Sequence, residues 1–189
     1  MTARRCTSVR DSATARPSPG EVDVRLPTPG WGYRTDSLGF TAYGEHWFAG
    51  TRSQNHHMFG AIVQWFSEDL AGVRPLEPGY RRIAFRPEVP GAVLDSVAVS
   101  YESVRGVVAS RWRCSPDGLE FDVTVPPNAV GVVYVPALNA TRVVEGRGGA
   151  TARADRAPGV RLLRTEPGRV VYEVTSGHYE SRVSGSPAR

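Results

Sequence analysis

The feature that most constrains this chain is a series of short β-type segments that begins near residue 79 and continues almost to the end. Each segment is enriched in β-branched or aromatic residues, and turns rich in Gly, Pro and Asp separate them. Leu119, Phe121 and Val123 alternate with polar side chains, as in a strand with one buried and one solvated face. We predict strands at residues 81–86, 93–102, 106–113, 119–125, 130–135 and 170–174, with a weaker pair at 141–145 and 160–165. This spacing indicates a mainly β fold, an antiparallel β-sandwich.

One amphipathic helix is predicted before the strands, at residues 58–70. Its apolar residues recur at helical spacing and define one face: Phe59, Ile62, Trp65, Phe66 and Leu70. Ser53 or Asn55 is the expected N-cap, and Gly72 followed by Pro75 prevents continuation. The change from period 3.6 to period 2 places a domain boundary within residues 72–79.

The two ends of the chain carry no such pattern. Residues 1–25 are basic and lack the apolar segment of a secretory signal peptide, so we predict a tail and a cytoplasmic protein. No run approaches the roughly 18 apolar residues of a membrane span, which excludes a membrane partner. We divide the chain into a tail (1–25), a helix-containing segment (26–78), a β-sandwich expected to fold on its own (79–183) and a short tail (184–189).

Charge and cysteine content narrow the function classes. All 23 basic residues are Arg, which is typical of a GC-rich genome, and they alternate with Asp and Glu instead of clustering. Nucleic-acid binding is therefore not expected. Cys6 and Cys114 fit neither a disulfide framework nor a zinc motif and are predicted to be free thiols. The adjacent His56 and His57 lack zincin spacing, so no metal or cofactor is predicted.

Residues 26–57 are rich in aromatic rings and glycine. Six aromatic residues fall within 18 positions, and Glu45 lies between Tyr43 and Trp47. Sugars stack on such rings, and glycoside hydrolysis needs two carboxyl groups on opposite sides of the scissile bond. From these residues alone two interpretations stay open: the rings pack a core beside an exposed Glu45, or they line a sugar-binding cleft.

Ordered motifs between residues 29 and 87 carry a family resemblance. They are P-G-W-G-Y at 29–33, T-A-Y-G-E-H-W at 41–47, S-Q-N-H-H-M-F-G at 53–60, G-V-R-P at 72–75 and G-Y-R-R-I-A-F-R-P at 79–87. Further pieces follow at 101–112, 122–128 and 134–137. Over roughly residues 26–179 the chain resembles the C-terminal part of bacterial α-L-rhamnosidases of glycoside hydrolase family 78. Gly44 and Ala42 depart from the Trp and Thr usual there, and the loop between Trp47 and Ser53 is short.

The resemblance implies one or two helices remaining from an (α/α)6 barrel, followed by a C-terminal antiparallel β-sandwich. It also implies inverting hydrolysis of terminal α-L-rhamnosyl residues, with Glu45 as the general base and His56 and Trp47 as substrate-binding residues. The family's general acid belongs to an earlier part of the barrel. We therefore expect this chain to be a C-terminal fragment that is inactive alone, because the members of a catalytic unit act jointly.

An alternative class of function is an autonomous carbohydrate-binding or structural β-sandwich module. A row of exposed aromatic side chains on one sheet would favour it. The expected partners are a rhamnose-containing glycoside once the missing barrel segment is supplied in trans, or a second copy through the apolar face of the helix.

Overall fold

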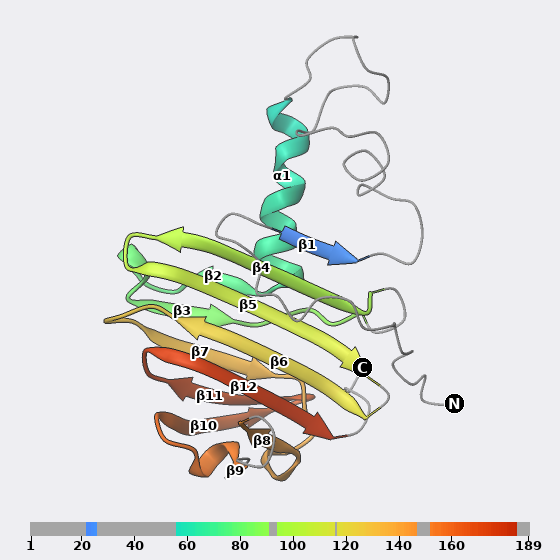
Figure 1. Ribbon diagram of the computed structural model, residues 1–189, viewed down its shortest axis with the longest axis vertical. Coiled ribbons are helices and arrows are strands. Elements are labelled where there is room, and N and C mark those ends of the chain that lie inside the picture. Colours follow the sequence, from blue (N-terminus) through green and yellow to red (C-terminus); the bar gives the residue numbers. More distant parts are fainter. Residues whose placement is uncertain (1–21, 26–55, 91–93, 116, 147–151, 185–189) are drawn as a thin grey trace.

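Two β-sheets face each other across one apolar core in the computed structural model, which describes residues 22–25, 56–90, 94–115, 117–146 and 152–184 (Figure 1). The seven-stranded sheet has the order β1-β4-β5-β6-β12-β8-β9, and the five-stranded sheet has the order β10-β11-β7-β3-β2. The described strands are β1 (Val22–Arg25), β2 (Val73–Pro75), β3 (Arg82–Phe85), β4 (Ser96–Ser103), β5 (Gly106–Ser115), β6 (Gly118–Val125), β7 (Val130–Val135), β8 (Val143–Glu145), β9 (Ala152–Arg153), β10 (Val160–Glu166), β11 (Arg169–Val174) and β12 (Gly177–Ser184). The prediction of a mainly β sandwich is confirmed.

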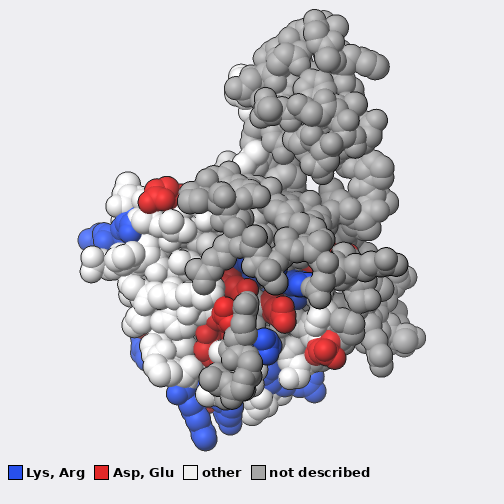
Figure 2. Space-filling model, viewed as in Figure 1, with Lys and Arg blue, Asp and Glu red and all other residues white. Residues whose placement is uncertain are grey.

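The seven-stranded sheet shows the alternation predicted from the sequence. β4, β5 and β6 form an antiparallel meander, and β12 pairs with β6 along its whole length. In β6 the side chains of Phe121 and Val123 are buried, whereas those of Glu120 and Asp122 are partly exposed on the outer face. Acidic side chains gather over the middle of this face, with basic ones beside them (Figure 2).

The five-stranded sheet contains one departure from a purely antiparallel sandwich. β3 and β7 are parallel, with Ile83 opposite Gly131 and Phe85 opposite Val133. Between them the chain crosses to the other sheet and runs through β4, β5 and β6. A parallel pair needs such a crossover, which a two-residue turn cannot provide.

The core between the sheets is built from large apolar side chains of both layers. Trp112 of β5, Phe121 of β6, Phe85 of β3 and Tyr172 of β11 are each at most 2% exposed. Fully burying such a side chain stabilises the fold by about 1.5–3 kcal/mol. Cys114 is also buried here, while Cys6 lies outside the described residues.

Four strands were not predicted from the sequence: β1, β2, β9 and β12. β1 corrects the assignment of residues 1–25 to a tail, because Val22–Arg25 pairs with β4 through backbone hydrogen bonds at the edge of the sheet. β2 lies within the predicted boundary loop and pairs with β3, so the five-stranded sheet begins upstream of Gly79. In the weaker pair, a short 3-10 helix (Ala140–Arg142) precedes β8 where the sequence predicts strand from residue 141.

Candidate active site

A helix of 14 residues precedes the strands of the five-stranded sheet. It consists of α1 (His57–Trp65) and a π-helical continuation, η2 (Phe66–Leu70), in agreement with the prediction at 58–70. Its N-cap position is His56, with extended dihedral angles and no side-chain cap hydrogen bond. The expected caps, Ser53 and Asn55, lie outside the described residues.

Of the three predicted site residues, the structure describes His56. Its imidazole is half-buried at the start of α1, and the ring of His57 lies 5.4 Å away, centroid to centroid. Glu45 and Trp47 lie outside the described residues, so their positions relative to His56 stay predictions. Within the described ranges no group of three or more His, Cys, Asp or Glu residues is arranged to hold a metal ion.

The helix is seated on the sandwich by its C-terminal end. Phe66 and Leu70 are buried in the main core and Ile62 packs against it, whereas Trp65 is 46% exposed. Figure 1 shows α1 standing out from the edge of the sandwich near β4 and β1. The side chain of Phe59, the remaining member of the predicted apolar face, is not among those described.

Hydrogen bonds from the sandwich also reach the last carbonyl groups of this helix. The last four carbonyl groups of a helix have no partner within it. Here the backbone oxygens of four consecutive residues each accept a hydrogen bond from a donor in or beside the sheets: Glu68 from Arg74 Nε (3.2 Å), Asp69 from the Glu88 N–H (2.9 Å), Leu70 from Trp112 Nε1 (2.7 Å) and Ala71 from Ser110 Oγ (2.6 Å). The helix end is therefore satisfied almost entirely by the sandwich.

Gly72 makes the close approach of the helix end to the sheet possible. It follows the helix with φ of +75°, the left-handed conformation that glycine adopts without strain, as predicted from its position. A Cβ atom there would lie 2.1 Å from the backbone carbon of Arg86. Its carbonyl oxygen accepts a hydrogen bond from the Arg86 N–H at 2.8 Å, which begins the pairing with β3.

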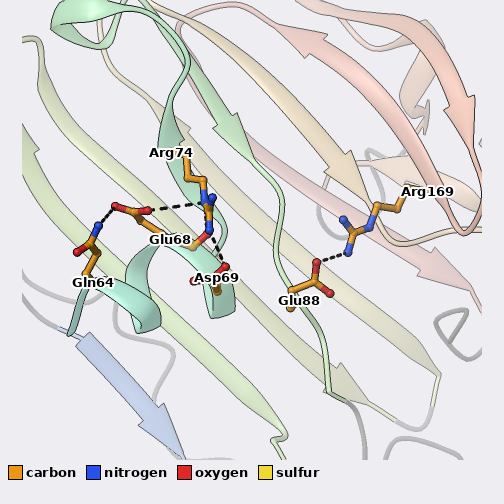
Figure 3. Close-up of polar contacts among 6 residues, drawn as sticks. All are labelled: Gln64, Glu68, Asp69, Arg74, Glu88 and Arg169. Carbon is orange, nitrogen blue, oxygen red and sulfur yellow. Dashed lines mark hydrogen bonds and ion pairs between the residues drawn. The ribbon is translucent and has the colours of Figure 1, made fainter. Parts of the chain in front are cut away.

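Charged side chains surround the same junction (Figure 3). Arg74 donates from Nη2 to Asp69 Oδ1 at 2.6 Å, and its Nε lies 3.8 Å from a carboxylate oxygen of Glu68. Gln64 donates to the other carboxylate oxygen of Glu68 at 2.8 Å. On the far side of the junction, Arg169 of β11 donates to Glu88 at 2.9 Å. The side chains of the two Arg74 pairs are between one-third and about one-half exposed, so each of these pairs contributes less than about 1 kcal/mol.

The acidic residues of the helix are poorly placed for sugar chemistry. Glu68 and Asp69 are the carboxylates of the segment 57–70, and both lie at its C-terminal end. At about 1.5 Å per residue, Glu68 is about 18 Å along the helix from His56. Both carboxylates lie close to Arg74 at the junction, and they help to attach the helix end to the sandwich.

A further polar cluster, which sequence patterns did not single out, lies where β8 meets β12. Glu145 accepts hydrogen bonds from the Glu180 N–H at 2.6 Å and from Ser181 Oγ at 2.9 Å. Burial raises the pKa of Glu145, and these two hydrogen bonds oppose that rise. On the exposed side, His178 lies 3.1 Å from a Glu180 carboxylate oxygen and 3.2 Å from Thr124 Oγ1. The cluster joins β8 to β12.

Comparison with known proteins was made for the sequence and for the fold. Residues 72–150 match the family model of the bacterial alpha-L-rhamnosidase C-terminal domain. An alpha-L-rhamnosidase of Streptomyces avermitilis is 30% identical over 165 residues, which cover 82% of this chain and 15% of that protein. One of Formosa agariphila is 27% identical, over 85% of this chain and 18% of that protein. The chain thus spans less than a fifth of the length of these relatives.

The structural comparison agrees. The structure of alpha-L-rhamnosidase from Dictyoglumus thermophilum superposes with a TM-score of 0.61 at 28% identity, over 85% of this chain and 18% of that chain. The crystal structure of the Streptomyces avermitilis enzyme complexed with L-rhamnose gives a TM-score of 0.60, over 81% of this chain and 15% of that chain. The alignment of more than four-fifths of this chain extends beyond the residues of the family model.

Proposed function

Since residues 72–150 are the C-terminal domain of bacterial α-L-rhamnosidases, we propose that this chain supplies the C-terminal part of an enzyme that hydrolyses terminal α-L-rhamnosyl residues. The observation that carries the proposal is the joint match of sequence and fold to α-L-rhamnosidases over more than four-fifths of the chain. One of those relatives is described in complex with L-rhamnose.

The proposed chemistry is a single displacement with inversion at the anomeric carbon. Glu45 takes a proton from a water molecule, whose oxygen attacks the anomeric carbon as the glycosidic bond breaks. A carboxylic acid on the opposite side protonates the leaving oxygen, and the two carboxyl groups lie roughly 6.5–9.5 Å apart so that the water fits between. His56 and Trp47 bind the sugar.

We infer that the acid comes from polypeptide outside these 189 residues, because the resemblance places it in an earlier part of the barrel. Among the described residues, the carboxylates nearest to His56 along the helix are engaged with Arg74 at the far end. A base without its acid and without a complete pocket gives essentially no turnover. The purified chain is therefore expected to be inactive alone and to act when joined to the preceding part of a related enzyme.

The alternative, an autonomous sugar-binding sandwich, gains no support from the described surface. Such a module would present a row of exposed aromatic side chains on one sheet. In the described strands the aromatic side chains are buried or partly buried, and the exposed aromatic residue, Trp65, belongs to α1.

The helices among the described residues are too short or too polar to span a membrane.

The test measures hydrolysis of an aryl α-L-rhamnoside by the chain alone and by a fusion to the preceding part of the Streptomyces avermitilis relative. We expect turnover from the fusion only, and its loss in Glu45→Gln. Glu68→Gln is the matched control, since it changes a carboxylate at the C-terminal end of the helix, about 18 Å along it from His56, and should retain activity. Hydrolysis by the isolated chain that survives Glu45→Gln would refute both the role of Glu45 and the need for further polypeptide.

A further inference from the structure

The C-terminal end of the helix is held on the sandwich by hydrogen-bond donors from several different segments. The carbonyl groups of its last three residues and of the C-cap residue Ala71 accept hydrogen bonds from donors in β2, in β5 and in the segment after β3, and thus from both layers of the sandwich. Contacts with several non-collinear donors restrain both the tilt of a helix and its rotation about its own axis. An apolar contact alone is non-directional and leaves both freer.

Two of these donors are fully buried side chains of β5. Trp112 is 0% exposed and Ser110 is 1% exposed, and each donates to one helix carbonyl at 2.7 Å and 2.6 Å respectively. They share one face of the strand, two residues apart. A buried donor without a partner costs about 1–3 kcal/mol, so the seated helix is the arrangement that both side chains favour.

We propose that Trp112 and Ser110 are positioning residues, which fix the direction of α1 and thereby the place of His56 at its other end. This inference rests on the proposed function in one respect, namely that the proposed function makes His56 a sugar-binding residue. The helix between Leu70 and His56 is about 20 Å long, so a tilt of about 5° at the seated end displaces His56 by about 1.7 Å. Misplacement of a substrate-binding group by about 1 Å can reduce turnover about 10²-fold. The sandwich would therefore set the position of His56 from the opposite end of the helix.

The experiment measures the direction of the helix in the full 189-residue chain without any assay of activity. Nitroxide labels are placed at Ala61→Cys on α1 and at Glu102→Cys on β4, both of them exposed positions, in a Cys6→Ser background. Cys114 is buried and does not compete for the label. Pulsed electron spin resonance then gives the distribution of distances between helix and sandwich, well below the unfolding temperature.

Ser110→Ala and Trp112→Phe each remove one donor and keep most of the side-chain volume. We expect the distance distribution to broaden by about 1–2 Å in each variant, and more in the double variant. Two controls should leave it unchanged. Ser115→Ala removes a hydroxyl of the same strand that donates to the Gly118 carbonyl in its own turn, and Tyr172→Phe removes a buried hydroxyl that has no hydrogen-bond partner among the described residues.

Distributions as narrow as that of the parent chain in both Ser110→Ala and Trp112→Phe would overturn the inference. Should Trp112→Phe unfold the domain, Ser110→Ala decides alone, because it removes a single oxygen atom. Broadening that also appears in the controls would show a general loosening of the sandwich and would likewise contradict a positioning role. An inactive fusion enzyme would refute the proposed function and leave the label distances unaffected, so the two failures are distinguishable.

Discussion

Removal of everything before Gly79 is the most informative perturbation of this fold. The sequence places the start of the sandwich there, because the period-2 pattern begins there. In the structure, however, Phe66, Leu70 and Val73 lie upstream of that point and are buried in the common core at 8%, 2% and 2% exposure. The truncation also removes β2 from the edge of the five-stranded sheet.

The expected loss follows from the three buried side chains. At about 1.5–3 kcal/mol for each, their removal destabilises the domain by about 4.5–9 kcal/mol. The lost backbone pairing of β2 adds to this figure. The donors of Trp112 and Ser110 contribute little, since water can reach them once the helix is gone. A domain of this size has a total stability of about 5–15 kcal/mol, so the truncation takes most of it.

The assay compares two truncated chains in urea, followed by circular dichroism and tryptophan fluorescence. A chain that begins at His56 should unfold in one cooperative transition, whereas a chain that begins at Gly79 should show a much lower midpoint or no transition at all. If the two midpoints agree within the equivalent of about 1 kcal/mol, the helix end is not part of the sandwich core, and the boundary at Gly79 is right.

Two further predictions concern stability. Gly72→Ala should lower the free energy of unfolding in urea by about 2–5 kcal/mol, because the backbone there is left-handed and the added Cβ would overlap Arg86. The matched control is Gly79→Ala, where φ is +66° and the space around the Cβ is open, so the loss should be only about 1–2 kcal/mol. Equal losses in the two variants would contradict the close approach of Gly72 to Arg86. Because burial raises the pKa of Glu145 above its unfolded value, the folded state holds that proton more tightly, and stability should fall as pH rises through the raised pKa. Glu145→Gln should flatten this fall in unfolding measured from pH 4 to 7, and an unchanged slope would assign the pH dependence to another group.

Much of the sandwich can be predicted from the sequence because its strands are rich in β-branched residues and because β5 and β6 alternate between buried and partly exposed positions. β7 occupies the predicted residues 130–135, and β6 differs from its prediction by one residue. β12 is not predicted from the sequence because one of its buried positions is Ser181, whose hydroxyl donates a hydrogen bond to Glu145. The inward-facing side chains of β12 are therefore Tyr179, Ser181 and Val183 instead of three apolar residues. Buried polar positions depend on partners far along the chain, which periodicity cannot reveal.

The edge strands are not predicted from the sequence for a different reason. β2 is three residues long and ends in Pro75, which a sheet tolerates at its edge and which reads locally as a helix breaker or a turn. β1 carries few large apolar residues and is held by backbone pairing with β4. In both cases the strand forms because a partner strand is available for backbone pairing, and its own residues do not indicate this.

The candidate site likewise has parts that can be predicted from the sequence and parts that cannot. The helix follows from apolar spacing, with a predicted start at Met58 that is one residue after the observed start at His57. The roles of Glu45, His56 and Trp47 come from the family resemblance alone. The seat of the helix on Trp112 and Ser110 could not be predicted, because a Trp and a Ser in the middle of a strand read as ordinary core and ordinary polar positions. Their partners are backbone carbonyls about 40 residues earlier, with separations of 42 and 39 residues.

The same separation has a consequence for the order of events during synthesis. The carbonyl group of Leu70 leaves the ribosome 42 residues before the indole that it will bond. At about 5–20 residues per second, this delay is about 2–8 s. During that time the helix can form but has no defined direction. Its orientation is settled only when β5 has been made and joined to its neighbours, so a strand that is translated later determines the direction of the helix that precedes it.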